Sequence, residues 1–224
     1  MPAPISVIIP TLNAEAHLSA CLAHLYEGVS EGLIKEVLLA DGGSTDDTQT
    51  IAREWGAEII DCPKGRGTQL AHAIQQASGE WYFVVHADTR IQGDWPAIIR
   101  VHLNSSKLAG YGKLRFDTSG LGPFVTASWA NFRSRFFGLP YGDQTLLISR
   151  QLYRQIGGYS EIPLMEDVDI ARKLRGKKCA LHFIALTDSK KYATVGWFRR
   201  GAKNLYILML YTLGRDPEAL AKLY

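Results

Sequence analysis

The sequence predicts an α/β protein: a mostly parallel, doubly wound sheet flanked by helices, with a helical C-terminal extension. Along residues 5–85, short apolar segments alternate with amphipathic ones, an order typical of parallel strands joined by right-handed helical crossovers. Residues 81–85, Trp-Tyr-Phe-Val-Val, are apolar throughout, which indicates a strand buried on both faces. A chain of 224 residues with 46% hydrophobic content is long enough to bury a full core.

The individual elements follow from apolar runs and from the residues that interrupt them. The first predicted strand, residues 5–9, ends at Pro10, and Asn13 is expected to cap the helix that follows. Further strands are expected at residues 36–40, 57–61, 81–85, 111–116, 144–149 and 179–184, and further helices up to Trp55 and over residues 67–78, 94–102, 124–137, 150–156, 165–172 and 197–212.

Some of these elements have recognisable ends. Ser44 and Asp47 approximate a capping box for the helix that ends at Trp55. Gly79 is expected to close helix 67–78 as its C′ residue, and Asp94 to cap the next helix.

Charge divides the chain into a domain over residues 1–184 and a basic, aromatic, helical extension over residues 185–224. From Arg172 to Lys203 there are ten Lys or Arg residues and one acid, Asp188, although the net charge is only +3. This imbalance favours an anionic or phosphate-bearing partner on the C-terminal side. A solvated basic face is the alternative.

Cysteine usage and the N-terminus predict a cytoplasmic protein. Cys21, Cys62 and Cys179 are odd in number and widely spaced, so they form neither a disulfide framework nor a metal-knuckle pattern. No secretory signal is visible, and the longest apolar run, residues 205–211, is too short to span a bilayer. A peripheral position at the inner membrane surface stays compatible with these features.

The clearest candidate for a site is Asp88, which follows the buried strand 81–85. In open α/β sheets, ligands bind at the carboxyl ends of the strands, where the loops frame a crevice. A carboxylate there, with His86 two residues earlier, can hold a divalent cation against a diphosphate. The alternative is a turn aspartate that caps the next segment.

A second acidic cluster opens the helix predicted at residues 165–172. Glu166, Asp167 and Asp169 place three carboxylates within four residues. Acids in a first turn complement the helix dipole, which is the simpler explanation. Capping this helix requires fewer than three carboxylates, so a further role is open.

Residues 124–137 combine Trp129, Phe132, Phe136 and Phe137 with arginines. Apolar residues at helical spacing usually pack into a core, which is the favoured interpretation. The alternative is a surface that contacts an amphipathic acceptor.

Five short motifs together resemble the family 2 glycosyltransferases of the GT-A fold. They occur in the order and at the spacing of that family, and they cover roughly residues 4–175. The motifs are residues 10–15 (PTLNAE), 40–46 (ADGGSTD), 65–67 (GRG), 86–88 (HAD) and 166–167 (ED). The small size, residues 142–144 and the tail at 213–217 resemble a soluble branch found alongside radical-SAM and selenodomain proteins.

The resemblance implies a role for single residues on the donor side. Thr11 and Leu12 would line the base pocket of a nucleotide-sugar donor, and Asp41 would face the base or ribose. Arg66, presented between glycines near a helix start, would meet the diphosphate, and Ala87 would lie among the donor-binding residues.

The resemblance also implies two acidic roles. Asp88 matches the second acid of the family's Asp-x-Asp metal motif, and Asp167 matches the acid that takes a proton from the acceptor hydroxyl. The first acid of the metal motif is His86 here, and imidazole suits Mn²⁺ better than Mg²⁺. The Gln-x-x-Arg-Trp signature of processive synthases is absent, which argues against a polymer-extruding enzyme.

The predicted function is transfer of a sugar from a nucleotide-diphosphate sugar to an acceptor hydroxyl, with inversion and with a divalent cation (Mn²⁺ or Mg²⁺). Residues 1–184 would then be a GT-A-like, nucleotide-sugar-binding catalytic domain of the hexosyltransferase class. The aromatic and basic content of residues 124–137 and 197–203 favours a lipid-linked or phosphorylated acceptor with peripheral membrane contact. No nucleic-acid partner is expected, and the oligomeric state stays open.

Two rival functions remain at this point. A nucleotidyltransferase that makes nucleotide sugars would share the sheet and the metal, although it usually carries a Gly-rich loop directly after the first strand. A non-catalytic nucleotide-binding module would keep the same fold. This alternative is compatible with His86, which replaces the first acid of the metal motif. A nicotinamide dehydrogenase is disfavoured because no Gly-x-Gly-x-x-Gly follows the first strand.

Overall fold

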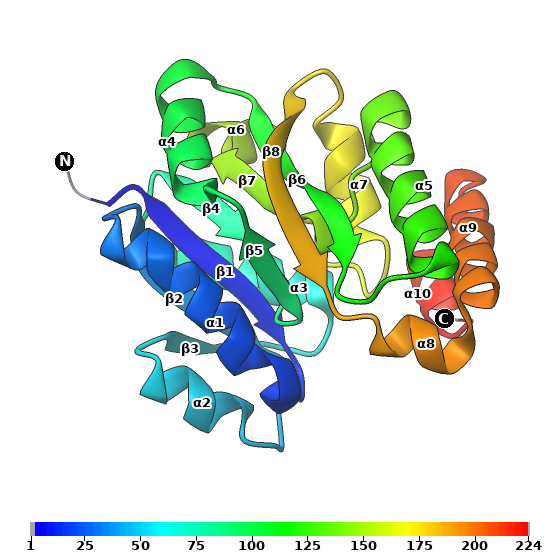
Figure 1. Ribbon diagram of the computed structural model, residues 1–224, viewed down its shortest axis with the longest axis horizontal. Coiled ribbons are helices and arrows are strands. Elements are labelled where there is room, and N and C mark those ends of the chain that lie inside the picture. The colour runs from blue at the N-terminus through cyan, green and yellow to red at the C-terminus, as the bar shows by residue number, and fades with distance from the viewer. Residues whose placement is uncertain (1–2, 224) are drawn as a thin grey trace.

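The fold is an eight-stranded mixed sheet with helices on both faces, in a computed structural model that describes residues 3–223 (Figure 1). The strands are β1 (Ile5–Thr11), β2 (Ile34–Asp41), β3 (Glu58–Asp61), β4 (Trp81–Val84), β5 (Thr89–Gln92), β6 (Ala109–Phe116), β7 (Leu146–Ser149) and β8 (Lys178–Thr187). The helices are α1 (Glu15–Ser30), α2 (Thr48–Glu54), α3 (Arg66–Gln76), α4 (Trp95–Ser105), α5 (Leu121–Phe137), the 3-10 helix η1 (Gly142–Gln144), α6 (Arg150–Gln155), α7 (Glu166–Lys173), α8 (Lys190–Val195), α9 (Trp197–Thr212) and α10 (Pro217–Ala221).

The sheet has a parallel half and a mixed half. The strand order is β3-β2-β1-β4-β7-β6-β8-β5, and the first four strands pair in parallel. β7 runs antiparallel to β4 and to β6, and β5 runs antiparallel to β8. The predicted α/β class with flanking helices is therefore confirmed. The sheet is less uniformly parallel than the strand–helix alternation of the first half suggests.

The core lies on both faces of the central strand β1, because alternate side chains of a strand point to opposite faces. Val7 and Ile9 belong to the cluster that contains Leu18 of α1 and Trp95 of α4. Ile8 belongs to the cluster on the other face, with Leu70 of α3. This burial on both sides explains why the first strands are continuous apolar runs.

The C-terminal helices pack beside the sheet. Ile207 of α9 and Leu220 of α10 form a cluster with Met165 and Val168 at the start of α7, and α5 and α9 lie side by side (Figure 1). β8 continues to Thr187, and the division of the chain at residue 184 stays a prediction. Within residues 3–223, no helix combines the length and the apolar character needed to cross a membrane.

Three predicted helix ends are wrong, and two of them fail because of contacts between distant loops. Ala14, not Asn13, is the N-cap of α1; Asn13 has a left-handed φ of 51°, and its side-chain oxygen accepts a hydrogen bond from the Thr45 N–H at 2.9 Å. The Ser44 hydroxyl donates to Asp41 instead of forming a capping box, and the Asp47 N–H donates to Glu15 at 3.1 Å.

Gly79, the third of these ends, lies beside the backbone of β1 and is not a left-handed C′ residue. Helix α3 ends at Gln76 with Ala77 as its C-cap. The Gly79 N–H donates to the Ser6 hydroxyl at 2.7 Å, and a Cβ atom at position 79 would lie 2.5 Å from the Ser6 nitrogen. This glycine is needed because two backbone segments approach closely.

Four elements were not predicted. Strand β5 begins directly after Asp88 and is short, the 3-10 helix η1 ends at Gln144, where a strand was expected to begin, and α8 and α10 are short helices in the C-terminal extension. The N-cap position of Asp94 before α4 is confirmed.

We expect Gly79→Ala to lower the free energy of unfolding by about 1–3 kcal/mol, because the methyl group must displace the β1 backbone. Gly201→Ala is the matched control, since it lies within α9 with no atom within 4 Å of the added Cβ. That change should be neutral, or stabilising by up to about 1 kcal/mol. Urea unfolding of both variants measures the difference; equal stabilities would contradict the close packing at residue 79.

Candidate active site

The carboxyl ends of the parallel strands bring the first group of site residues together. β1 ends at Thr11, which pairs with Asp41 at the end of β2. β4, the neighbour of β1 on its other side, leads directly into His86 and Asp88. All four side chains therefore lie along one edge of the sheet, which is where ligands bind in folds of this class.

Both carboxylate oxygens of Asp41 accept hydrogen bonds from neighbouring residues. Its Oδ1 accepts hydrogen bonds from the hydroxyls of Thr11, at 2.9 Å, and Ser44. Its Oδ2 accepts from the Ser44 N–H at 2.9 Å and the Gln49 amide at 3.0 Å. Burial alone would raise the pKa of Asp41, but the hydrogen bonds from Ser44, Gln49 and Thr11 outweigh it and lower the pKa. Asp41 is therefore a buried anion that fixes the turn, beside Leu12, which is 39% exposed.

Gln69 of α3 ties the ends of β1 and β2 together and was not predicted. Its amide nitrogen donates to the carbonyls of Thr11 at 2.8 Å and Ala40 at 2.7 Å. Its only signal in the sequence is a polar residue among the apolar positions of a buried helix face. Because Gln69 is itself buried, the cradle formed by Thr11 and Asp41 is a rigid part of the fold.

The second group of site residues meets around Gly142 in η1. A Cβ atom on Gly142 would lie 2.4 Å from the Nε2 of His86, so the two residues are in close contact. On its other side, the Gly142 N–H donates to the Oδ2 of Asp167 at 3.1 Å. His86, from the loop after β4, and Asp167, from the first turn of α7, are thus separated by one glycine.

The pKa of Asp143 indicates that Asp88 and Asp167 lie near the same carboxyl group. Burial raises the pKa of Asp143 to about 6; Arg133 and Arg66 oppose that rise, and the charges of Asp167 and Asp88 add to it. The structure therefore brings Asp88 and Asp167, 79 positions apart in the chain, within electrostatic range of the same carboxyl group. Asp143 was not predicted as a site residue.

Arg66 connects the donor-side helix α3 to α7. Its guanidinium pairs with the Oε1 of Glu166 at 3.1 Å; the Arg66 side chain is 46% exposed, whereas that of Glu166 is 2% exposed. Burial raises the pKa of Glu166 to about 7, Arg66 opposes the shift, and Asp167 adds to it. Arg66 therefore lies where the two acidic residues at the start of α7 meet the N-terminus of α3.

The acidic residues fit a divalent cation only if a ligand supplies oxygens as well. Among residues 3–223, no group of three or more His, Cys, Asp and Glu side chains is placed to hold an ion. Mg²⁺ and Mn²⁺ are commonly held by one or two carboxylates together with substrate phosphates. Asp88, with His86 beside it and Asp143 nearby, has that chemistry.

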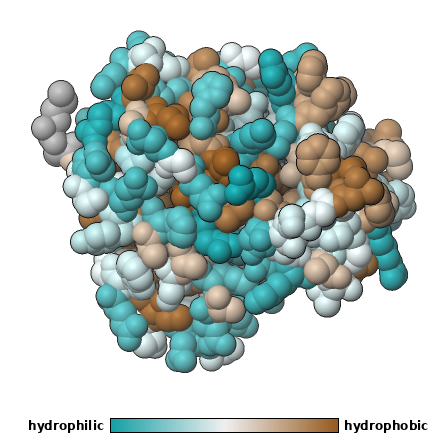
Figure 2. Space-filling view, viewed as in Figure 1, coloured by the Kyte–Doolittle hydropathy of each residue, from teal (hydrophilic) through white to brown (hydrophobic). Residues whose placement is uncertain are grey.

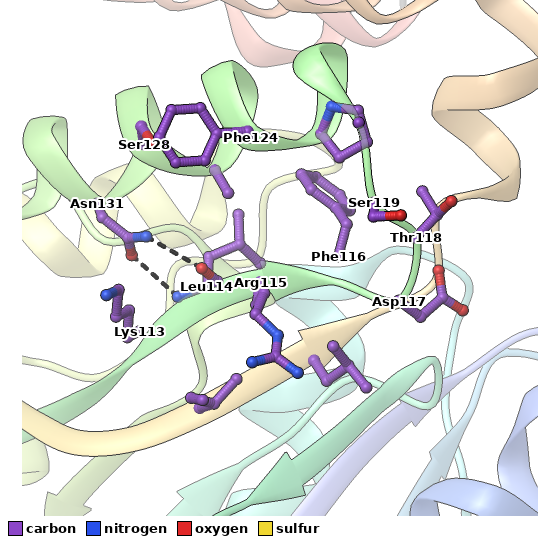
Figure 3. A pocket seen from close by; sticks show the side chains of 15 residues that line it. Lys113, Leu114, Arg115, Phe116, Asp117, Thr118, Ser119, Phe124, Ser128 and Asn131 are labelled. Carbon is purple, nitrogen blue, oxygen red and sulfur yellow. Dashed lines mark hydrogen bonds between the residues drawn. The ribbon is translucent and has the colours of Figure 1, made fainter.

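A groove of about 650 Å³ lies beside this region, between β6, α5 and the loop that joins them (Figure 3). Lys113 and Arg115 of β6 and Phe124 of α5 line it. None of the predicted site residues lines this groove. The groove is linked to Asp143 through Thr187, whose carbonyl accepts from the Asp117 N–H at 3.2 Å and whose hydroxyl donates to the Asp143 carbonyl at 3.5 Å.

Comparisons with known proteins agree on one family. Residues 6–115 match the family model described as glycosyl transferase family 2. An uncharacterized glycosyltransferase from Mycobacterium bovis is 32% identical over 97 residues, which cover 42% of each chain. A PGL/p-HBAD biosynthesis glycosyltransferase from Mycobacterium tuberculosis is 36% identical over 96 residues, 39% of this chain and 37% of that protein. The matches thus span less than half of these curated relatives.

Solved structures support the fold over nearly the whole chain. Glucosyl-3-phosphoglycerate synthase from Mycobacterium tuberculosis, in complex with Mn²⁺ and UDP-glucose, superposes with a TM-score of 0.62 at 19% identity, covering 93% of this chain and 78% of that one. The GT-A-like fold expected from the motifs is confirmed. Over residues 6–115, the sequence is therefore similar to glycosyl transferase family 2.

Proposed function

We propose that the protein is a glycosyltransferase that moves a sugar from a nucleotide-diphosphate sugar to an acceptor hydroxyl, with inversion and with a divalent cation. The observation that carries this proposal is the convergence of His86, Asp88 and Asp167 around Gly142 and Asp143. One acid lies on the side of the donor strands and the other opens a helix on the far side of η1. That arrangement supports a metal-assisted leaving group opposed by a general base.

Thr11, Leu12 and Asp41 form the proposed pocket for the nucleoside. Thr11 and Asp41 are already bonded to each other and to the turn at Ser44, so they offer a fixed polar floor beside the exposed Leu12. A direct bond from Asp41 to a base or ribose would replace one of its present hydrogen bonds. A preformed pocket of this kind costs little to organise on binding.

Asp88, Ala87, His86 and Arg66 form the proposed diphosphate region. The cation, Mn²⁺ or Mg²⁺, would neutralise charge on the leaving diphosphate when bound. Arg66, at the N-terminus of α3, adds a half-exposed guanidinium, a group that pairs well with phosphate oxygens. The Mn²⁺ and UDP-glucose in the structural neighbour support this assignment.

Asp167 is the proposed general base. Two backbone N–H groups fix its carboxylate: Gly142 donates to Oδ2 at 3.1 Å and Val168 donates to Oδ1 at 2.7 Å. A carboxylate positioned in this way can accept the proton of an attacking hydroxyl. With a single such base and no second nucleophile assigned, direct displacement with inversion is the mechanism that we propose.

The acceptor is proposed to be a phosphorylated or lipid-linked alcohol. The structural neighbour is named for a phosphorylated product, glucosyl-3-phosphoglycerate. In this chain the excess of basic residues from Arg172 to Lys203 favours an anionic acceptor. The proposed setting is the cytoplasm, with peripheral contact at the inner membrane surface.

We expect Asp167→Asn to lower release of UDP from UDP-sugars by about 10²- to 10⁴-fold, because the general base is lost, while UDP affinity stays nearly unchanged. Asp169→Asn, in the same helical turn, is the matched control and should keep the activity. The assay uses a panel of UDP-sugars with Mn²⁺, and calorimetry measures UDP affinity. Normal turnover in Asp167→Asn would contradict its role, and pyrophosphate release from a sugar phosphate and a nucleoside triphosphate would instead favour the nucleotidyltransferase.

A second variant tests the cation site. Asp88→Ala should weaken the Mn²⁺-dependent part of UDP binding by at least about tenfold, since even residues that only support a metal ligand are commonly worth that much. Asp61→Ala, an exposed acid at the end of β3, is the control. Calorimetric titration of UDP with and without Mn²⁺ measures the effect; an unchanged titration in Asp88→Ala would exclude it as a ligand.

Asp143 predicts a pH dependence of stability in the protein without cation or donor. Its ordinary pKa of 3.8 rises to about 6 in the folded state, mainly through burial. Between these values the folded state holds a proton that the unfolded state has lost, so this carboxyl lowers stability as pH rises. The stability of Asp143→Asn relative to wild type should therefore increase between pH 3.8 and about 6, by up to about 1.4 kcal/mol per pH unit. Urea unfolding with a chelator present measures this; a constant difference would contradict the prediction.

A further inference from the structure

The aromatic residues of α5 form an exposed stripe and not a core face. Positions 121, 125, 129, 132 and 136 recur at helical spacing and all point to solvent. Phe136 is 68% exposed, and Phe124 beside the stripe is 70% exposed. The rings contact one another along the helix, with Phe132 and Phe136 centroids 4.5 Å apart. The core interpretation of residues 124–137 is therefore wrong for these side chains.

Helix α9 carries a matching exposed stripe. Phe198, Leu205 and Met209 are 71%, 52% and 50% exposed and lie on one face of the helix. Trp129 of α5 and Leu205 of α9 are both exposed and line the same small cavity between the two helices. The two stripes thus join into one surface, called here the α5–α9 face, which consists of Leu121, Phe124, Val125, Trp129, Phe132, Phe136, Phe198, Leu205, Tyr206 and Met209. Figure 2 shows apolar residues gathered on this side of the molecule.

The charged residues of the two helices that form the α5–α9 face are all basic. Neither α5 nor α9 contains an acidic residue. Arg135 of α5 and Arg199 and Lys203 of α9 are exposed on the flanks of the two stripes. An apolar, aromatic face bordered by cations is the pattern of a surface that enters the headgroup region of an anionic bilayer.

A second copy of the chain fits this face poorly. In a two-fold dimer the same patch meets itself, so Arg199 and Lys203 would approach cations of the other copy with no acid on either helix to compensate. A bilayer instead offers hydrocarbon for the rings and phosphates for the cations.

The α5–α9 face is also close to the candidate active site. The cavity that Trp129 and Leu205 line has Tyr141 and Asp143 on its inner wall. Buried polar atoms of Arg133 and Asp143 that lack a hydrogen-bond partner also belong to residues of this cavity. Residues of the exposed face and Asp143 thus line one cavity.

We propose that the α5–α9 face docks on an anionic lipid surface and that the acceptor is lipid-linked, presented from that surface to the site at Asp143 and Asp167. The assignment of the acceptor rests on the proposed glycosyltransferase function. The docking of the face does not, because it follows from exposed residues outside the catalytic machinery.

The test is sedimentation of the full chain with vesicles of phosphatidylcholine alone or mixed with phosphatidylglycerol. Wild type should bind the anionic vesicles, and Phe132→Ser/Phe136→Ser should reduce partitioning by at least about tenfold, because two large apolar groups are lost. Arg199→Glu/Lys203→Glu should also reduce it, and high salt should do the same to wild type. Tyr26→Ser/Val101→Ser, which alters residues 61% and 66% exposed on α1 and α4, should bind as wild type does.

The outcomes separate the two proposals. Lack of wild-type binding to anionic vesicles, or equal binding by all variants, overturns the docking surface. A dimer in light scattering that Phe132→Ser/Phe136→Ser dissociates, without vesicle binding, also overturns it and assigns the face to a second copy. Phe132→Ser/Phe136→Ser should keep the release of UDP from UDP-sugars. Absence of that activity in the wild-type protein would instead contradict the proposed function. Circular dichroism confirms that each variant is folded.

Discussion

The contact of Gly142 with His86 on one side and with Asp167 on the other is the constraint on which the site depends. It joins the loop after the parallel strand β4 to the first turn of helix α7. Only a residue without a side chain fits between them, since a Cβ atom would overlap the imidazole. Segments far apart in the chain thereby meet at one glycine.

The charged residues around Gly142 also interact with one another. The charges of Asp88 and Asp167 make Asp143 harder to ionise, and Asp167 does the same to Glu166, while Arg66 and Arg133 offset part of that cost. A bound cation would relieve the same repulsion, so the empty protein is less stable in this region than the complex would be. The donor side differs, because the charge of Asp41 is fully satisfied by hydrogen bonds within the chain.

The parallel half of the fold could be predicted from sequence, because strands buried on both faces are continuous apolar runs, as in residues 81–85. β5 could not, since it has only four residues, three of them polar, directly after Asp88, and such a short segment resembles a loop. Asn13 and Ser44 have the composition of helix caps but are used by each other's loops instead. Such contacts between distant segments leave no local trace in the sequence.

Asp88 and Asp167 could be predicted from motifs, whereas Asp143 and Gln69 could not, because their importance comes from what surrounds them in space.

The most direct test of the account is a crystal of the protein soaked with UDP and Mn²⁺, with anomalous scattering used to find the metal. The account predicts a manganese peak at Asp88, with the diphosphate toward Arg66 and Asp167 facing the same cleft. A manganese peak away from Asp88, or UDP bound outside the edge formed by Thr11 and Asp41, would contradict it.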